Sequence, residues 1–527
     1  MNRRRVAAVL AATLSATLLA ACGSSSSTDP ADPNVLTVMA GSEIKDLEPL
    51  LPDLEKATGV KLLLSYSGTL EGAESIAGGA ATDAAWFSHG KYLSLLPGAG
   101  SRIVTQERIM LSPVVMGVKK SVADRFGWTD NPNVTWKDIE ARSADGSLRF
   151  AMTNPAASNS GLTALIGVAS ALSGSSDAID AGQIDTTALR AFFKGQALTA
   201  GSSGFLADAY VREQDSLDGM VNYESILMSL NAGTTLHEPL TLIYPKEGIV
   251  TADYPFMLLN ASKREAFDKV TTYLRSPEVQ KRIMTDTLRR PAVPGIALDP
   301  RFDSRTLIEL PYPARLETID ALITAYLDEV RKPASAIFVL DVSTSMDGDR
   351  LANLKTAMKT LTGTDPSLTG RFARFRAREE VTIITFAAAV EDTREFTIDD
   401  TNPDSPDMTA IRDYVDGLTT TGGTAIYSGL EQAYDVVRRK QATDPDRLYS
   451  IVLMTDGENN SGVDPDTFAA DYGALPDAAR NVHVNPVLFG DASRDAMTSL
   501  ASLTGGKLFD ATTTSLASIF KQIRGYQ

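Results

Sequence analysis

Apolar and polar positions in the first half of the chain predict alternating strands and helices. A strand-like apolar run at Val35–Ala40 is followed by a helical pattern near residues 43–58 and by a second strand-like run at residues 60–66. Another helical pattern comes directly after residues 67–69. Because β and α units alternate in this way, we expect a parallel sheet with helices on both faces.

The second half of the chain repeats this alternation with longer apolar strands. Strand-like runs occupy residues 336–340, 381–386, 448–454 and 482–488, helical patterns occupy residues 350–361 and 425–438, and residues 390–398 indicate a short edge hairpin. Nearly continuous apolar strands are typical of a parallel sheet that helices cover on both faces. The second half therefore also predicts an α/β fold.

A helix is expected between the two halves. Residues 316–330 carry apolar side chains at helical spacing, and Pro333 ends the pattern. The pattern leaves open whether this helix completes the first folded block or acts as a semi-rigid spacer. We therefore expect a first domain at residues 35–312, a helical linker at 313–333 and a second domain at 334–527.

The start of the chain resembles a bacterial lipoprotein signal. Arg3, Arg4 and Arg5 precede a nearly uncharged run at residues 6–21, which is short for a membrane span of about 20 strongly apolar residues. The sequence Leu-Ala-Ala-Cys at residues 19–22 resembles a lipobox, which implies cleavage before Cys22 and a thioether link from its thiol to diacylglycerol, with acyl chains such as palmitate. An ordinary signal peptide is the alternative. We expect a signal at residues 1–21, a flexible tether at 22–34, and a protein held at the extracytoplasmic face of the cell membrane by lipid alone.

Composition and charge limit the classes of molecule that this protein is expected to bind. Cys22 is the only cysteine, so no disulfide can form within the chain. The net charge is −16, and removal of the three signal arginines leaves −19. Such an acidic chain is a poor partner for nucleic acid, whose phosphates need clustered Lys and Arg, and it is not expected to lie flat on an anionic membrane.

Oxygen-bearing side chains follow the first predicted strand of the second domain. Asp341, Ser343 and Ser345 alternate at its carboxyl end, where open α/β sheets bind their ligands. Alternate side chains in an extended segment point the same way, so these three can converge on one point. A carboxylate and two hydroxyls suit a hard cation such as Mg²⁺ or Mn²⁺.

Two later loops add oxygens to this set. Thr424 ends a Thr-Gly-Gly-Thr turn before a predicted helix, and Asp456 in Thr-Asp-Gly ends a later apolar strand. Together with Asp341-x-Ser343-x-Ser345, these residues resemble the metal-ion-dependent adhesion site of von Willebrand factor A domains. The resemblance implies a Rossmann-like doubly wound domain, a bound Mg²⁺ or Mn²⁺, and a protein partner whose Glu or Asp carboxylate completes the metal shell. An A domain that folds but no longer binds metal is the alternative.

An enzyme is not expected. The chain has three histidines, His89, His237 and His483, and none is close in sequence to the two serines, so a serine nucleophile would lack its usual base. No phosphate-binding Gly-x-x-x-x-Gly-Lys-Ser/Thr loop occurs, which disfavours a chelatase-like assembly factor coupled to ATP.

Segments of the first domain resemble extracellular solute-binding proteins of ABC-type importers. They are the opening strand and helix and residues 66–69, 153–161, 221–224, 243–248 and 275–280. The resemblance implies a two-lobed, type II periplasmic-binding-protein-like fold that closes on a ligand. The residues expected to contact a solute are Ser67, Gly68, Thr69, Ser158, Asn159, Ser160, Asn222, Tyr223 and Glu224.

Residues 67–69 and 158–160 stand before predicted helices. Free N–H groups at helix N-termini favour anions, so we expect a small oxyanion or carboxylate as the solute. The alternative is that they are ordinary N-caps. The leading interpretation is a membrane-anchored binding protein with solute capture in one domain and metal-dependent protein adhesion in the other. A receptor that delivers a small anionic solute to a permease is the second interpretation.

Overall fold

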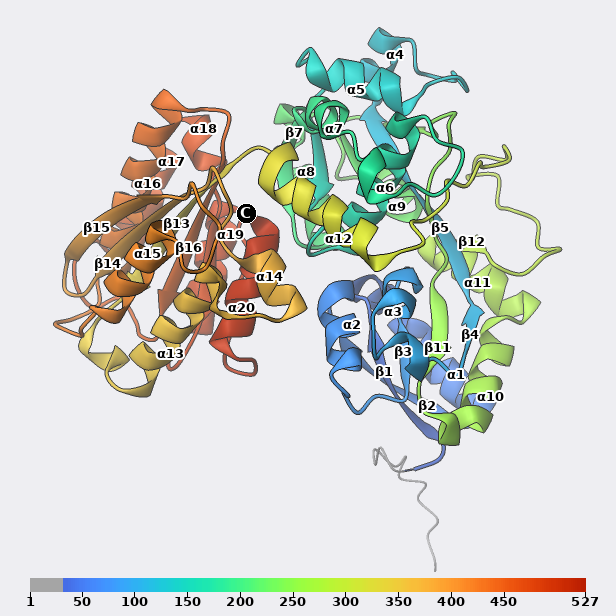
Figure 1. Ribbon diagram of the computed structural model, residues 1–527, viewed down its shortest axis with the longest axis horizontal. Coiled ribbons are helices and arrows are strands. Elements are labelled where there is room, and N and C mark those ends of the chain that lie inside the picture. Colours follow the sequence, from blue (N-terminus) through green and yellow to red (C-terminus); the bar gives the residue numbers. More distant parts are fainter. Residues whose placement is uncertain (1–31) are drawn as a thin grey trace, which may run out of the picture.

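The computed structural model describes residues 32–527 and arranges them as two α/β domains, the first of which has two lobes (Figure 1). The α/β fold class predicted from the sequence is confirmed. The signal, Cys22 and most of the tether lie outside the described residues. Among residues 32–527, no helix has both the length and the apolarity needed to cross a membrane.

The first lobe is built on a five-stranded sheet in the order β2-β1-β3-β11-β4. Its strands are β1 (Val35–Ala40), β2 (Lys61–Tyr66), β3 (Ala84–Trp86), β4 (Thr105–Arg108) and β11 (Pro255–Leu258). Its helices are α1 (Leu51–Thr58), α2 (Thr69–Ala77), α3 (Lys91–Leu95), α10 (Arg264–Leu274) and α11 (Pro277–Thr287). Strands β2, β1 and β3 are parallel, whereas β11 runs antiparallel to both of its neighbours.

The second lobe has a seven-stranded sheet with the central path β10-β5-β8-β6-β7. Its strands are β5 (Met110–Lys119), β6 (Phe150–Thr153), β7 (Gln196–Ala200), β8 (Gly219–Tyr223), β9 (Leu240–Ile243), β10 (Thr251–Ala252) and β12 (Arg290–Pro291). Its helices are α4 (Lys120–Phe126), α5 (Trp136–Ala144), α6 (Asn159–Ser173), α7 (Thr186–Phe193), α8 (Ser203–Glu213) and α9 (Glu224–Ala232).

The first domain was expected to contain a parallel sheet, and its two sheets are mixed instead. Strand β5 runs antiparallel to β8, β9, β10 and β12, and β11 runs antiparallel to β3. The chain passes directly from β4 in one lobe to β5 in the other, and returns from β10 to β11. A strand that returns from the other lobe enters the sheet from the opposite end, so it pairs antiparallel.

Helix α12 (Leu316–Ala325), the helix expected between the domains, completes the first domain. Its residues Ile319, Leu322 and Ile323 are buried in the hydrophobic core of the first domain. The hydroxyl of Tyr326, in the following turn, donates a hydrogen bond of 3.2 Å to Gln196 Oε1 in the second lobe. Because these side chains are packed into the lobe, α12 is not a free spacer.

The second domain has a six-stranded sheet in the order β15-β14-β13-β16-β17-β18. Its strands are β13 (Ala334–Asp341), β14 (Glu380–Phe386), β15 (Val390–Thr397), β16 (Leu448–Thr455), β17 (Val484–Leu488) and β18 (Phe509–Asp510). All neighbours pair parallel except the edge strand β15. The sequence predicted a parallel sheet and an edge hairpin at residues 390–398, where the structure has the single strand β15, which forms a hairpin with β14. One buried cluster includes side chains of α13 (Asp349–Lys359), α15 (Pro406–Asp416) and α20 (Leu516–Ile523), and the other includes side chains of α16 (Ile426–Thr443), α17 (Pro465–Gly473) and α19 (Arg494–Thr504).

Candidate functional site

Hydroxyl and carboxylate side chains converge at the carboxyl ends of β13 and β16. Asp341 ends β13, and its buried carboxylate accepts hydrogen bonds from Ser343 N (2.7 Å) and Thr455 Oγ1 (2.6 Å). The Oγ atoms of Ser343 and Ser345 are 2.9 Å apart, and Ser345 Oγ donates to Asp456 Oδ1 at 2.7 Å. Four of the five predicted metal-site residues are therefore linked to one another.

The fifth residue, Thr424, lies at the same place. A Cβ added to Gly457 would be 3.7 Å from both Ser345 Oγ and Thr424 Oγ1, so the two hydroxyls flank one point. The turn that carries Thr424 is held by its own N–H, which donates to Asn460 Oδ1 at 2.8 Å. Three loops thus bring all five predicted side chains to one edge of the sheet.

The two carboxylates at this edge have different surroundings. Burial raises the pKa of Asp341. The hydrogen bonds from Ser343 and Thr455 lower this pKa, but burial has the larger effect. Asp456 is fully buried, and its second oxygen is paired with the guanidinium of Arg350. The same guanidinium donates to Asp491 Oδ2 at 2.7 Å.

The residues present fit a hard divalent cation. The set contains two carboxylates and three hydroxyls, which are oxygen ligands of the kind that Mg²⁺ and Mn²⁺ prefer. Among residues 32–527 there is no cluster of three or more His, Cys, Asp or Glu side chains placed to hold a metal ion. A cation here would therefore depend on the hydroxyls as much as on the carboxylates.

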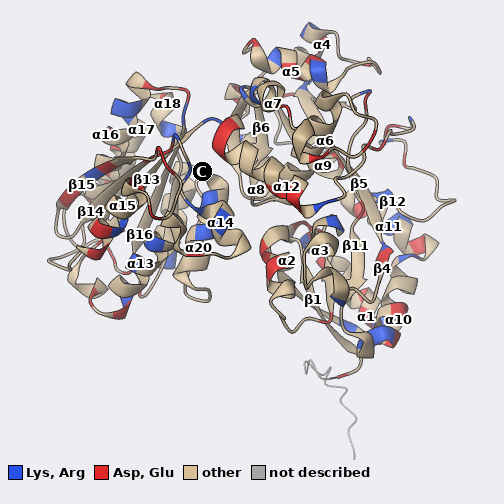
Figure 2. Cartoon of the chain, in the orientation of Figure 1, with Lys and Arg blue, Asp and Glu red and all other residues tan. Residues whose placement is uncertain are grey.

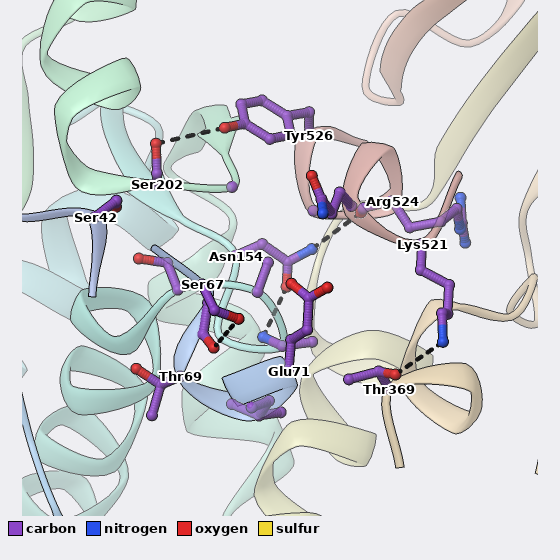
Figure 3. A pocket seen from close by; sticks show the side chains of 18 of the residues that line it. Ser42, Ser67, Thr69, Glu71, Asn154, Ser202, Thr369, Lys521, Arg524 and Tyr526 are labelled. Carbon is purple, nitrogen blue, oxygen red and sulfur yellow. Dashed lines mark hydrogen bonds between the residues drawn. The ribbon is translucent and has the colours of Figure 1, made fainter. Parts of the chain in front are cut away.

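A cavity of about 290 Å³ opens between the two lobes of the first domain (Figure 3). The first lobe contributes Ser42, Glu43 and residues 66–71, the second lobe contributes Asn154 and residues 156–159 and 201–203, and the second domain contributes Thr369, Phe372, Ala373, Lys507, Ser518, residues 521–522 and residues 524–526. The volume is close to the lower end of the range of about 300–1,000 Å³ typical of small-molecule sites.

Three helices begin at this cavity. They are α2, α6 and α8, with Gly68, Ser158 and Ser202 as their N-cap residues. In the described chain, none of these three cap residues accepts a side-chain hydrogen bond from the first turn of its helix. The first-turn N–H groups therefore remain available to an anion, and the helix dipoles favour negative charge at the same place.

Two buried acceptor oxygens in the cavity wall have no hydrogen-bond partner among the described residues. Asn159 is 5% exposed, and its Nδ2 donates to Ser88 Oγ at 2.5 Å. Within residues 32–527, neither its Oδ1 nor Glu43 Oε1 has a hydrogen-bond partner. A buried polar atom without a partner is unfavourable, so these oxygens suit a ligand that carries a donor group.

Comparison with known families agrees with this architecture. Residues 36–286 match the family model of bacterial extracellular solute-binding proteins, and residues 336–458 match that of the von Willebrand factor type A domain. The chain combines a solute-binding-protein domain with a von Willebrand factor type A domain. We call them the solute-binding domain and the A domain. The family of the first is extracellular, which agrees with the predicted extracytoplasmic location.

Curated relatives match short segments only. The calcium-activated chloride channel regulator 1 of Homo sapiens is 34% identical over 86 residues, which are 16% of this chain and 8% of that protein. The inter-alpha-trypsin inhibitor heavy chain H1 of Sus scrofa is 25% identical over 133 residues, which are 24% of this chain and 13% of that protein. This chain thus spans only a small part of the length of these relatives.

Similar solved structures exist for both domains. The periplasmic binding protein AfuA from Actinobacillus pleuropneumoniae, with fructose-6-phosphate bound, has 16% identity and a TM-score of 0.43, and covers 56% of this chain and 98% of its own. A von Willebrand factor type A protein from Catenulispora acidiphila has 18% identity and a TM-score of 0.30, and covers 37% of this chain and 43% of its own. Identities this low do not indicate which solute this chain binds.

The residues predicted to contact a solute lie at three different distances from the cavity. Ser67, Gly68, Thr69, Ser158 and Asn159 line the cavity. Ser160 and Asn222 lie behind its wall, where Ser160 Oγ is 2.8 Å from Ser203 Oγ and Asn222 donates to Ser203 O at 3.2 Å. Both are therefore placed to support the wall.

Tyr223 and Glu224 lie further from the cavity. The hydroxyl of Tyr223 donates to Ser88 Oγ at 2.8 Å, and burial raises the pKa of the tyrosine. Glu224 is fully buried and accepts two hydrogen bonds from the Arg290 guanidinium, of 2.6 and 2.7 Å. The Tyr244 hydroxyl also donates to Glu224, so this carboxylate is used within the protein.

Several residues that line the cavity were not predicted from the sequence. Ser202 caps α8 and Ser203 begins it, as Ser158 caps α6 and Asn159 begins it, so the pattern of a helix N-terminus could have identified them. Lys521, Arg524 and Tyr526 come from the far end of the chain and carry no such signal.

Proposed function

We propose that the protein is a lipid-anchored, extracytoplasmic, non-enzymatic binding protein. It captures a small anionic solute between the lobes of the solute-binding domain, and it binds a protein partner through a divalent cation held by the A domain. The observation that carries the proposal is the convergence of the N-termini of α2, α6 and α8 on one cavity. Cys22 would carry the acyl chains.

The solute would be a small oxyanion or carboxylate. Its charged group would accept hydrogen bonds from the first-turn N–H groups beside Gly68, Ser158 and Ser202. A hydroxyl or amine on the same molecule would satisfy Asn159 Oδ1 and Glu43 Oε1. Since both kinds of group line one cavity, an anion that also carries a hydrogen-bond donor fits best.

In the A domain, Asp341, Ser343, Ser345, Thr424 and Asp456 would hold Mg²⁺ or Mn²⁺. The bound cation would supply a coordination position for a carboxylate of the partner. The five side chains offer five oxygens, so an incoming Glu or Asp could supply the sixth ligand of an octahedral shell. A partner that presents an exposed acidic side chain is therefore the expected class.

Solute binding can be tested on the full mature chain made soluble by Cys22→Ser. We expect millimolar phosphate, sulfate or citrate to raise the melting temperature, because a ligand at 100 times its Kd stabilises the fold by about 2.7 kcal/mol. Asn159→Ala is expected to weaken the binding of phosphate and citrate, which carry a hydroxyl, as measured by isothermal titration, and Asn133→Ala, which alters an exposed asparagine, is the matched control. If none of the three anions binds, anion capture is contradicted.

Replacement of Arg350 is expected to strengthen metal binding. In Arg350→Gln the cation no longer competes with a guanidinium for Asp456, so the affinity for Mg²⁺ should rise roughly fivefold, or about 1 kcal/mol, as for a partly exposed ion pair. Arg438→Gln, which breaks an exposed pair with Asp435 in the same domain, should have no effect. Weaker binding in Arg350→Gln would mean that Arg350 supports the site.

A further inference from the structure

The A domain lines one side of the cavity between the lobes. Its C-terminal segment, residues 516–527, runs along the cavity and contributes Lys521, Arg524 and Tyr526 to the lining (Figure 3). The segment comprises α20 and the turn that follows it. About 290 Å³ remains free behind it, so the segment borders the site and leaves room for a small solute.

Tyr526 contacts the second lobe at the edge of the cavity. Its ring packs edge-on against Phe205 with the centroids 5.2 Å apart, and its hydroxyl lies 3.4 Å from Ser202 Oγ (Figure 3). Lys507 Nζ donates to the same hydroxyl at 2.7 Å. The tyrosine is therefore held by contacts from both domains.

The two backbones also touch at this point. A Cβ added to Gly525 would lie 2.6 Å from Ala157 Cβ and 3.3 Å from Gly201 Cα, and both of these atoms belong to the second lobe. Asn154 Nδ2 donates to Arg524 O at 3.4 Å beside this contact. Gly525 thus allows an approach that no larger residue would permit.

The first lobe is held by a second set of contacts. The Glu74 carboxylate on α2 accepts hydrogen bonds from Leu368 N at 2.6 Å and from Thr369 N at 3.1 Å, at the start of α14 (Leu368–Ala373). Ser518 Oγ on α20 donates to Glu71 Oε1 at 3.2 Å. In Figure 2 the ribbon of α2 carries acidic positions, and the ribbons of α14 and α20 on the other side of this boundary carry basic positions.

A third set of contacts holds α8 of the second lobe. His483 Nε2 is 2.9 Å from Glu213 Oε1, and Arg212 donates to Gly505 O at 2.8 Å. Both A-domain residues lie near the amino ends of strands of the sheet, with His483 directly before β17. The predicted metal site is at the carboxyl ends of the strands, so the docked A domain keeps that edge away from the cavity.

We infer that the solute site has three walls, the two lobes and the C-terminal segment of the A domain, so that solute exchange requires the A domain to separate from at least one lobe. This inference rests on the proposed solute capture and adds that the A domain controls access to the cavity. A solute enclosed by both domains stabilises the docked arrangement, and the docked arrangement slows the release of the solute.

Thiol accessibility tests this closure without any solute. In the soluble full chain with Cys22→Ser, the variant Ser202→Cys carries a single thiol, inside the cavity. We expect a maleimide dye to label it at least about tenfold more slowly than the exposed thiol of Thr272→Cys, because labelling requires the closed site to open. Equal rates in the two variants would overturn the inference.

Two independent disruptions of the interface should remove the protection. One is Gly525→Leu, whose new side chain would collide with Ala157 and Gly201 of the second lobe. The other is Glu74→Arg combined with Glu213→Arg, which reverses charge at both lobes and leaves the A domain unchanged. The matched control is Glu265→Arg with Glu278→Arg, two exposed acidic residues of the first lobe.

In both disrupted chains we expect Ser202→Cys to be labelled as fast as Thr272→Cys and the radius of gyration to increase, whereas the control keeps the protection. Persistent protection in chains whose radius of gyration has increased would show that the lobes close the site alone and would overturn the inference. Failure of the anion titrations would contradict solute capture but would leave this result intact, so the two failures can be told apart.

Discussion

Asp341→Asn is expected to abolish the binding of Mg²⁺ and Mn²⁺ by the full soluble chain. Asp341 provides one of only two carboxylates among the five converging side chains, and the amide removes its charge while keeping its shape. The asparagine can still accept a hydrogen bond from Ser343 N, so the loop should keep its conformation. Isothermal titration with each metal measures the effect, and we expect an affinity loss of at least about a hundredfold.

The control for this prediction is Asp392→Asn. Asp392 lies on the edge strand β15 of the same domain, where its carboxylate pairs with Arg394. Metal binding by this control should equal that of the unchanged chain. If Asp341→Asn binds metal as well as the control does, the five converging side chains are not the metal site and the adhesion proposal fails with them.

Glu379→Ala is expected to destabilise the protein by about 3–5 kcal/mol, because it leaves buried arginines without their partner. The side chains of Glu379, Arg331 and Arg524 are 2%, 2% and 5% exposed. Arg524 donates to both carboxylate oxygens, at 2.6 and 2.8 Å, and Arg331 pairs with the same carboxylate and donates to Gln527 O at 3.0 Å. Urea unfolding measures the loss, and Glu391→Ala on the exposed side of β15 is the control.

The effect of Glu379 should also depend on pH. Burial alone would raise its pKa, but the charges of Arg524 and Arg331 outweigh burial and hold the pKa below the usual 4.5. A carboxyl whose pKa is lowered in the folded state stabilises the fold above its unfolded pKa and loses this contribution as the pH falls through the folded pKa. The stability difference between the unchanged chain and Glu379→Gln should therefore narrow below about pH 4.5. A difference that widens in acid would contradict this assignment.

Most elements of the A domain could be predicted from the sequence. The expected strand at residues 336–340 is β13 (Ala334–Asp341), and the expected helix at residues 425–438 is α16 (Ile426–Thr443). Strands that are buried on both faces give uninterrupted apolar runs, so their positions are visible in a single sequence.

The solute-binding domain was harder to predict. Only its first two strands were predicted, at residues 35–40 and 60–66, which are β1 and β2. The directions of β5 and β11 could not be predicted, because an apolar run has the same pattern whichever way it enters a sheet. The helix at residues 316–330 was also found, but only its contacts, such as that between Tyr326 and Gln196, assign it to the first domain.

The sequence by itself determined which side chains stand at the ends of strands and at the starts of helices, since periodicity and cap residues are local properties. It therefore pointed to Asp341 and Ser343, and to the helix starts at Gly68 and Ser158. Only the tertiary structure decided which surfaces meet. Ser202 and Tyr526 are separated by 324 positions, and their contact depends on how the A domain packs against a lobe. No local pattern records such a contact, because the free energy that forms it comes from two complementary surfaces that exist only after each domain has folded.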